Sequence, residues 1–277
     1  MKKILVPTDF SACADKALQF AYTIAEKGGG EIILLHACNL DNEKAENRYN
    51  TTVYNKPITK TAATKLEVLK NHIRQSGKVE VSVHLFDGDI VESILDAEAK
   101  HAIDLIVMGT QGASGLKKII MGSKTAAVIS KAQAPVIAIP ADYSGQTINN
   151  ILLAVNQSNK ELDYLEPLFQ LAQLFNATIR MVIFSDTEEA VTYIDDRRTI
   201  TGIQYRLQEK YSQQNLQTDH LTGKDFGEAL QDYIDENNID LLVMITHKKT
   251  GLEGLFYKSQ TRQMAYHTTI PLLAIHH

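Results

Sequence analysis

The chain has 277 residues, a length typical of two domains, and its 44% hydrophobic and 22% charged residues are ordinary for a globular protein. The net charge of −5 argues against a nucleic-acid partner, and no apolar run reaches the roughly 18 residues of a membrane span. The short apolar N-terminal run, which stops at Pro7, and the two isolated cysteines predict a cytoplasmic protein without a signal peptide, a membrane contact or a disulfide framework.

The first half of the chain alternates strand and helix patterns. Ser11 is a suitable N-cap for a helix whose apolar residues follow a 3.6-residue period until the glycines at 28–30. Apolar runs predict strands at 4–6, 31–37, 79–85, 104–109 and 135–140, and helices are expected near 57–76 and 89–100 and from Gly122 onward. Uninterrupted apolar strands joined by helices predict an α/β fold with a parallel sheet covered on both faces.

The second half repeats the first. The segment KKILVPTDF near residue 2 returns as NNILLAVNQ near 149, AIDLIVMGTQGASGL at 102–116 returns as NIDLLVMITHKKTGL at 238–252, and APVIAIP at 134–140 returns within TIPLLAIHH at 269–277. Two domains are therefore predicted, at 1–142 and 147–277, with a polar linker between them. Strands are expected at 151–155, 178–184, 216–221, 240–245 and 271–275, and helices near 161–175, 194–214, 226–237 and 259–267.

A glycine pattern follows the fourth strand of the first copy. Gly109 and Gly112 are followed after nine residues by Gly122 and Ser123, which gives G-x2-G-x9-G-S. A glycine at a strand end lets the backbone approach a ligand, and the free N–H groups and dipole of a helix start attract phosphate. Ser123 and Thr125 can add hydroxyl donors. Glycine-rich turns also serve purely structural ends, but Asp9 ends the first strand, and ligands of open parallel sheets bind beyond the strand carboxyl ends.

These residues resemble the universal stress protein family across the first half. The resemblance is carried by ILVPTDFS, IILLHA, DLIVMGTQGASGL and GSKTAAVISKAQAPVIAIP, and the glycine spacing is similar to the ATP-binding signature of one branch of that family. It implies two doubly wound, Rossmann-like sheets of five parallel strands in the order 3-2-1-4-5. It also implies that the two copies pair within the chain through their fifth strands, with further homo-oligomers open.

The resemblance assigns the site residues by position. The adenosine side would involve Pro7, Thr8, Asp9, Ala37, Met108 and Gly109, and the phosphates would lie along Gly112, Gly122, Ser123 and Lys124 with Thr125 nearby. Ala37 and Met108 rest mostly on the resemblance, because apolar residues at strand ends more often belong to the core, and Lys124 can point to phosphate or to solvent. The expected cofactor is ATP, with Mg²⁺ held through its phosphates.

The second copy has lost the pattern. Gly109, Gly112 and Gly122 become Ile245, Lys248 and Lys258, Asp9 becomes Asn156, and only Ser123 is kept, as Ser259. Residues 1–142 carry a net charge of +1 and the rest a net charge of −6, so an anion meets less repulsion in the first copy. We therefore expect one nucleotide site per chain.

The expected function is adenine-nucleotide binding by a stress-response regulator with an unknown protein partner. No set of residues in the sequence assembles a nucleophile, a base and an oxyanion site, so no catalytic residue is assigned and at most slow ATP hydrolysis is expected. Two alternatives stay open, a nucleotide-independent interaction module and a slow ATPase or autokinase. The scattered histidines show no metal spacing, the isolated cysteines are typical of small core residues, and no metal ligand in the protein is expected.

Overall fold

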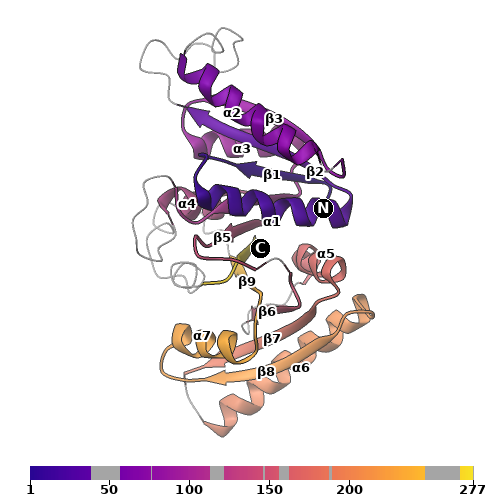
Figure 1. Ribbon diagram of the computed structural model, residues 1–277. Helices are drawn as coiled ribbons and strands as arrows, with labels where there is room; N and C mark the ends of the chain where they lie inside the picture. The colour runs from indigo at the N-terminus through magenta and orange to yellow at the C-terminus, as the bar shows by residue number, and fades with distance from the viewer. Residues whose placement is uncertain are drawn as a thin grey trace. The chain divides into compact units, whose positions relative to one another are not determined.

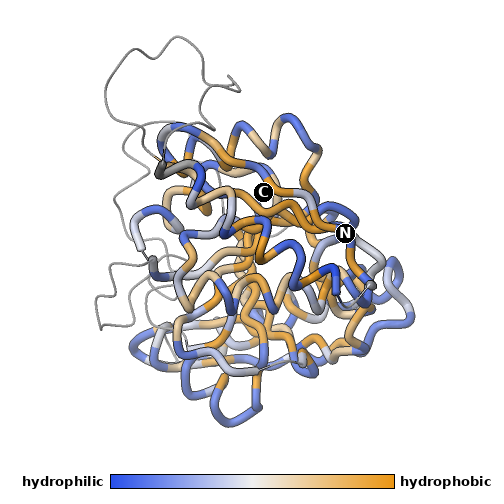
Figure 2. Tube along the Cα trace, turned by 45° about the horizontal axis from the view of Figure 1, so that its top comes forward, coloured by the Kyte–Doolittle hydropathy of each residue, from blue (hydrophilic) through white to orange (hydrophobic). Residues whose placement is uncertain are grey.

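A computed structural model describes residues 1–38, 57–75, 77–112, 122–145, 147–155, 162–186, 189–246 and 269–276. The chain divides into two compact units, Met1–Ala141 and Asp142–His277, and each is described by itself. Hydrophobic residues follow the strands of both units, and hydrophilic residues gather on the outer turns (Figure 2).

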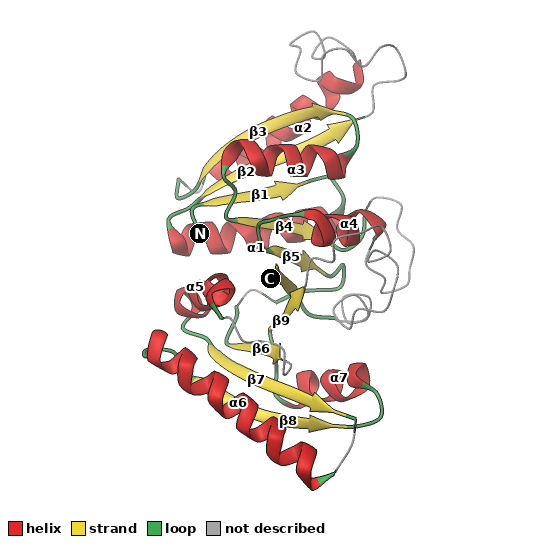
Figure 3. Cartoon of the chain, turned by 180° about the vertical axis from the view of Figure 1, so that it is seen from behind, coloured by secondary structure: helices red, strands yellow, loops and turns green. Residues whose placement is uncertain are grey.

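Unit 1 alternates strands and helices along the chain. Its elements are β1 (Lys3–Pro7), α1 (Ala12–Gly28), β2 (Glu31–Cys38), α2 (Pro57–Arg74), β3 (Glu80–Asp87), α3 (Ile90–His101), β4 (Leu105–Gly109), α4 (Ser123–Lys131) and β5 (Val136–Ile139). All pairings are parallel and give the strand order β3-β2-β1-β4-β5. α1 and α2 cover one face of this sheet, and α3 and α4 cover the other (Figures 1 and 3).

Local sequence explains where α1 begins and ends. The Ser11 side chain accepts a hydrogen bond from the Ala14 N–H and caps the helix start, as the sequence predicts. Gly29 ends the helix in the left-handed conformation (φ 62°), which glycine adopts without steric cost. Between these ends the buried side chains recur on one face, including Ala17, Ala21 and Ile24, and pack against the sheet.

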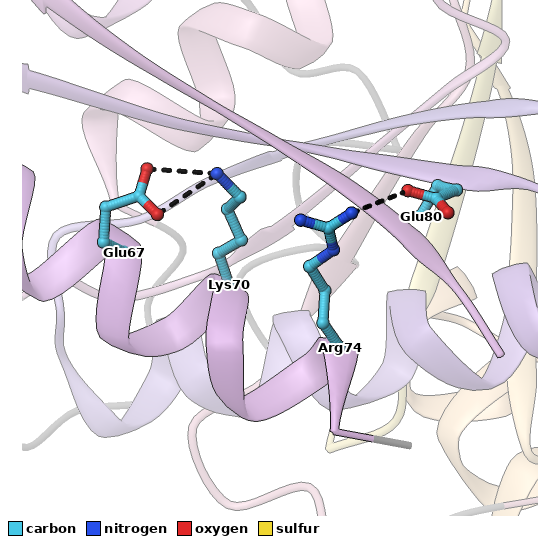
Figure 4. Close-up of polar contacts among 4 residues, drawn as sticks. All are labelled: Glu67, Lys70, Arg74 and Glu80. Atoms are coloured by element: carbon cyan, nitrogen blue, oxygen red, sulfur yellow. Dashed lines mark hydrogen bonds and ion pairs between the residues drawn. The ribbon is translucent and has the colours of Figure 1, made fainter. Parts of the chain in front are cut away.

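The outer face of α2 is solvated and charged. Lys70 Nζ lies 3.1 Å from a carboxylate oxygen of Glu67, and Arg74 Nη2 lies 3.5 Å from Glu80 Oε2 at the start of β3 (Figure 4). Exposed pairs of this kind contribute little to stability. The position of α2 therefore depends on its buried residues, such as Ala62 and Leu66.

Unit 2 repeats the architecture. Its described elements are β6 (Asn150–Val155), a 3₁₀ turn (Asp163–Leu165), α5 (Glu166–Phe175), β7 (Thr178–Ser185), α6 (Ala190–Lys210), β8 (Leu216–Thr222), α7 (Phe226–Glu236), β9 (Leu241–Thr246) and β10 (Leu272–His276). All its pairings are parallel, in the order β8-β7-β6-β9-β10. α6 and α7 lie on opposite faces of β8 (Figures 1 and 3). The predicted α/β class of the fold is confirmed.

Two helices of unit 2 differ from the sequence expectation. α6 spans Ala190–Lys210 rather than 194–214, and the chain leaves the helix at Tyr211, whose ring stacks on Phe169 at 3.7 Å between centroids. The helix expected at 161–175 becomes α-helical only from Glu166. The weakly signalled strand at 216–221 is present as β8, and the helix expected near 259–267 lies outside the described residues. Among the described helices, none is long and apolar enough to cross a membrane.

Candidate functional site

The site expected from the sequence lies where β1 and β4 end side by side. The two strands are parallel neighbours, with Leu5 opposite Ile106. Pro7 and Thr8 are buried at the end of β1, whereas Asp9, the next residue, is exposed. The carboxyl ends of both strands therefore present Asp9 and the loop after Gly109 at the same edge of the sheet.

Gly109 is a glycine because α1 packs closely against it. A Cβ added there would lie 2.6 Å from Cys13 Sγ and 3.1 Å from the Cys13 carbonyl carbon. A distance below 3.0 Å is shorter than real Cβ contacts, so a side chain would push the first turn of α1 away. The sequence interpretation assigned this glycine to close approach by a ligand, but the close approach in the structure is that of a neighbouring helix.

The other two motif glycines bring the loop ends together. A Cβ at Gly112 would lie 3.0 Å from Asp9 Oδ2, and one at Gly122 would lie 3.0 Å from the Thr110 carbonyl oxygen. The Gly122 N–H donates to that same oxygen at 2.6 Å. None of Gly109, Gly112 and Gly122 has a left-handed φ, so the motif needs glycine for space and not for backbone conformation.

Gly122 is also the N-cap of α4 and provides no capping side chain. The N–H groups of Ser123, Lys124 and Thr125 have no partners within the helix, because the first turn of any α-helix lacks them. The Ser123 and Lys124 side chains are exposed beside this turn. A helix start whose N-cap residue provides no capping side chain is a favourable position for an anion.

Thr125 points away from solvent. Its side chain is buried, and its hydroxyl donates to the Gly109 carbonyl oxygen at 2.9 Å. The sequence interpretation offered this hydroxyl to a ligand, whereas the structure uses it to tie α4 to the end of β4. The tie holds the start of α4 close to the strand end.

The remaining assigned residues occupy strand positions. Ala37 is half-buried in β2 opposite Phe86, and Met108 is buried in β4 opposite Ala138. Both positions fit ordinary core as well as they fit a pocket floor. At the end of β2, burial and the nearby Asp87 raise the pKa of the Cys38 thiol, which disfavours the reactive thiolate.

The comparisons with known proteins agree with the repeat and with the fold. A model of the universal stress protein family matches residues 1–140 and again residues 147–276. The chain belongs to the universal stress protein family. A universal stress protein of Synechocystis sp. is 26% identical over 294 residues, which cover 99% of each chain. A universal stress protein of Methanocaldococcus jannaschii is 30% identical over 156 residues, 50% of this chain and 94% of that relative.

A solved structure matches over the whole length. The crystal structure of a universal stress protein from Archaeoglobus fulgidus superposes with a TM-score of 0.74, covering 98% of this chain and 97% of that one. The sequence identity is 19%, so this likeness shows the fold alone.

The second universal stress protein unit departs from the first at the strand ends. Of the substituted positions, Ile245 lies in β9, whereas Asn156, Lys248, Lys258 and Ser259 lie outside the described residues. The helix caps Gly29 and Asn176 are both left-handed and occupy equivalent positions, which fixes the alignment of α5 with α1. Residues Asp163–Leu165, which align with 16–18 of α1, form a 3₁₀ turn, and α5 is α-helical only from Glu166.

A buried polar cluster in unit 2 was not found from the sequence. Ser185 Oγ lies 2.7 Å from His220 Nε2, and the same nitrogen lies 3.1 Å from Asp196 Oδ2. A catalytic relay needs the serine and the aspartate on different ring nitrogens, whereas here both contact Nε2. The His220 and Asp196 side chains are each 3% exposed, so the cluster is closed to substrates. Its role is to hold α6 onto β7 and β8.

His36 and Phe10 were also missed. The histidine interrupts the apolar run of β2, which is the one sequence signal that could have drawn attention to it. Its Nδ1 lies 2.7 Å from the Thr8 carbonyl oxygen, and the Phe10 ring packs on it at 4.5 Å between centroids. The described residues contain no group of three or more His, Cys, Asp or Glu side chains placed to hold a metal ion.

Proposed function

We propose that unit 1 binds ATP and that the protein is a nucleotide-responsive regulator of the stress response. The observation that carries the proposal is the uncapped start of α4, held beside Asp9 by the Gly112 and Gly122 loop ends. The glycine spacing resembles the ATP-binding signature of one branch of the family. Nucleotide occupancy would then change the conformation or the partner of the protein.

In the proposed complex, the phosphates and the adenosine of ATP lie at different elements of unit 1. The phosphates lie along Gly112, the Gly122 N-cap and the first-turn N–H groups of Ser123 and Lys124, where the helix dipole favours negative charge. Lys124 adds an exposed positive charge. Mg²⁺ would be held mainly by the phosphates.

The adenosine half lies toward the ends of β1, β2 and β4. The residues proposed for it are Pro7, Thr8, Asp9, Ala37, Met108 and Gly109. Asp9 is exposed and can accept hydrogen bonds from a ribose hydroxyl through the carboxylate oxygen that faces Gly112. Gly109 and Thr125 act indirectly, because one seats α1 and the other ties α4 to β4.

Calorimetric titration of the full chain tests the proposal. We expect one ATP per chain, because unit 2 has replaced each motif glycine by a residue with a side chain. Tripolyphosphate should bind more weakly at the same site, and guanosine triphosphate should bind more weakly than ATP. Two equivalent sites per chain, or the absence of binding with Mg²⁺ present, would contradict the proposal.

A second candidate function is a nucleotide-independent contact between copies of the chain, through α6. Among the described residues, every exposed large apolar side chain except Val68 lies on this helix, including Val191 at 71%, Ile194 at 56% and Tyr205 at 71% exposure. Ile194 and Tyr205 lie on one face of α6 at a spacing found in coiled coils. If two α6 helices paired antiparallel about a two-fold axis, Ile194 of one copy would face Tyr205 of the other.

The second candidate predicts a concentration-dependent dimer that Ile194→Asp weakens at least about tenfold, because a buried charge opposes association. Analytical ultracentrifugation with and without ATP measures the effect. Val68→Asp is the matched control, since Val68 is 62% exposed on α2 in the other unit and should leave association unchanged. Equal association by both variants would rule out this stripe as the contact.

A further inference from the structure

The segment Thr8–Ser11 between β1 and α1 is fixed by residues outside the glycine motif. Thr8 is buried, its N–H donates to the Leu35 carbonyl oxygen at 2.8 Å, and its hydroxyl accepts from the Phe10 N–H at 3.0 Å. The Thr8 carbonyl oxygen faces His36 Nδ1 at 2.7 Å. Because a carbonyl oxygen only accepts, Nδ1 carries the proton in this contact. All three polar groups of Thr8 are therefore engaged.

Phe10 adopts a backbone conformation that its residue type disfavours. Its φ is 63°, in the left-handed region that non-glycine residues rarely occupy. Strained residues of this kind persist where the surroundings enforce them, and they concentrate at functional sites. Here the Phe10 ring packs on the His36 ring, and Lys65 Nζ of α2 lies 5.1 Å from the centroid of the Phe10 ring.

The consequence falls on Asp9, which stands between these two anchored residues. The turn at Phe10 brings the Ser11 N–H to Asp9 Oδ1 at 3.0 Å and leaves Oδ2 on the side of Gly112. Ser11 then caps α1. One hydrogen bond and one aromatic contact from His36 thus fix the backbone on both sides of the exposed carboxylate.

The second copy provides an internal comparison. In the alignment of the two repeats, Val155 of unit 2 is equivalent to Thr8 of unit 1. The first two strands of each unit pair in the same register, Ile4 with Ile32 and Ile151 with Ile179. Ile183 is therefore equivalent to His36. Valine lacks the hydroxyl, and isoleucine lacks both the ring and the donor. The copy that lost Asp9 and the motif glycines has therefore also lost the support behind Asp9.

We propose that His36 and Phe10 are positioning residues for Asp9, and that they set the affinity for the nucleoside half of the nucleotide. The inference rests on the proposed ATP site, which it extends to two residues behind that site. Neither residue is required to touch the ligand. Their effect is to present the Asp9 carboxylate in one orientation before the ligand arrives, which lowers the ordering cost of binding.

A variant series at His36 separates the hydrogen bond from the aromatic contact. His36→Leu removes both, His36→Phe keeps a ring without a donor, and His36→Asn keeps a donor close to the Nδ1 position without the ring. We expect ATP and adenosine to bind His36→Leu about tenfold more weakly than the wild type, and tripolyphosphate to bind equally to both. His36→Asn should recover part of the lost affinity for ATP.

His84→Leu is the matched control. His84 is a half-buried histidine on the neighbouring strand β3, with its own ring contact to His101 at 4.8 Å. Burial and His101 lower the pKa of His84, so replacing the neutral ring at pH 7.5 removes no charge. This variant should bind ATP, adenosine and tripolyphosphate like the wild type.

Hydrogen exchange of the ligand-free protein tests the support directly. The Phe10 and Ser11 amides, which donate to Thr8 and Asp9, should lose protection in His36→Leu and keep it in His84→Leu. If the wild type binds ATP but His36→Leu binds it equally well, this inference is wrong and the proposed function stands. If the wild type binds no ATP, both are wrong. A parallel loss of tripolyphosphate binding in His36→Leu would reduce His36 to a general structural role and overturn the assignment.

Discussion

Gly122→Val is expected to weaken ATP binding at least about 100-fold, a loss of about 3 kcal/mol, while unit 1 stays folded. The valine methyl groups would occupy the space in front of the uncapped α4 turn, where the phosphates are proposed to lie. The backbone angles at Gly122, φ −60° and ψ 149°, are open to valine, so no backbone strain is added. Among the described residues, the new Cβ would meet the Thr110 carbonyl oxygen at 3.0 Å, and this backbone atom would have to move by a few tenths of an ångström.

The measurement is a calorimetric titration paired with a thermal melt. Gly202→Val is the matched control, because it makes the same chemical change in α6, where an added Cβ meets none of the described atoms within 4 Å. It should leave ATP affinity unchanged. If Gly122→Val bound ATP with wild-type affinity and melted normally, the phosphates would have to lie elsewhere.

Asp196→Ala is expected to lower the free energy of unfolding of unit 2 by about 3 kcal/mol, because it removes one partner of a buried polar contact. Asp196 is 2% exposed, and its carboxylate faces His220 Nε2 at 3.1 Å. Without it, the Ser185–His220 contact remains and α6 loses one of its polar contacts to β8, while Gln204 Nε2 still donates to the Leu216 carbonyl oxygen. Urea unfolding followed by hydrogen exchange in β7 and β8 measures the effect in unit 2.

The matched variant is His220→Leu combined with Asp196→Ala. The strand registers place His220 of unit 2 with Leu85 of unit 1, so the first copy already has an apolar residue at this position. Replacing both partners by apolar groups leaves neither side chain of the pair buried without its partner, and the double variant should be more stable than Asp196→Ala alone. If the double variant lost the full sum of the two single losses, the coupling would be absent.

Local patterns in the sequence determine most of the fold. The apolar runs predict the strands because strands buried on both faces are continuously hydrophobic, and the repeat predicts two units of one kind. Ser11 and the glycines at 28–30 fix the ends of α1 through cap geometry that depends on neighbouring residues alone. The boundaries of α5 and α6 were less accurate, and at the end of α6 the chain makes a tertiary contact, Tyr211 stacked on Phe169, that no local pattern encodes.

The glycine spacing by itself indicates the candidate site, because a small residue is needed wherever a backbone or a ligand approaches closely. Only the tertiary structure decides which approach each glycine serves. It places Gly109 against Cys13 of α1, Gly112 beside Asp9, and Gly122 against Thr110. These contacts form only when the sheet has assembled, because they join parts of the chain that are separate in the sequence. The tertiary structure also decides the contacts within two further groups, Thr8 with Phe10 and His36, and Ser185 with Asp196 and His220. Side-chain contacts between different strands and helices depend on strand register and on the face to which each side chain points, and no local pattern encodes either.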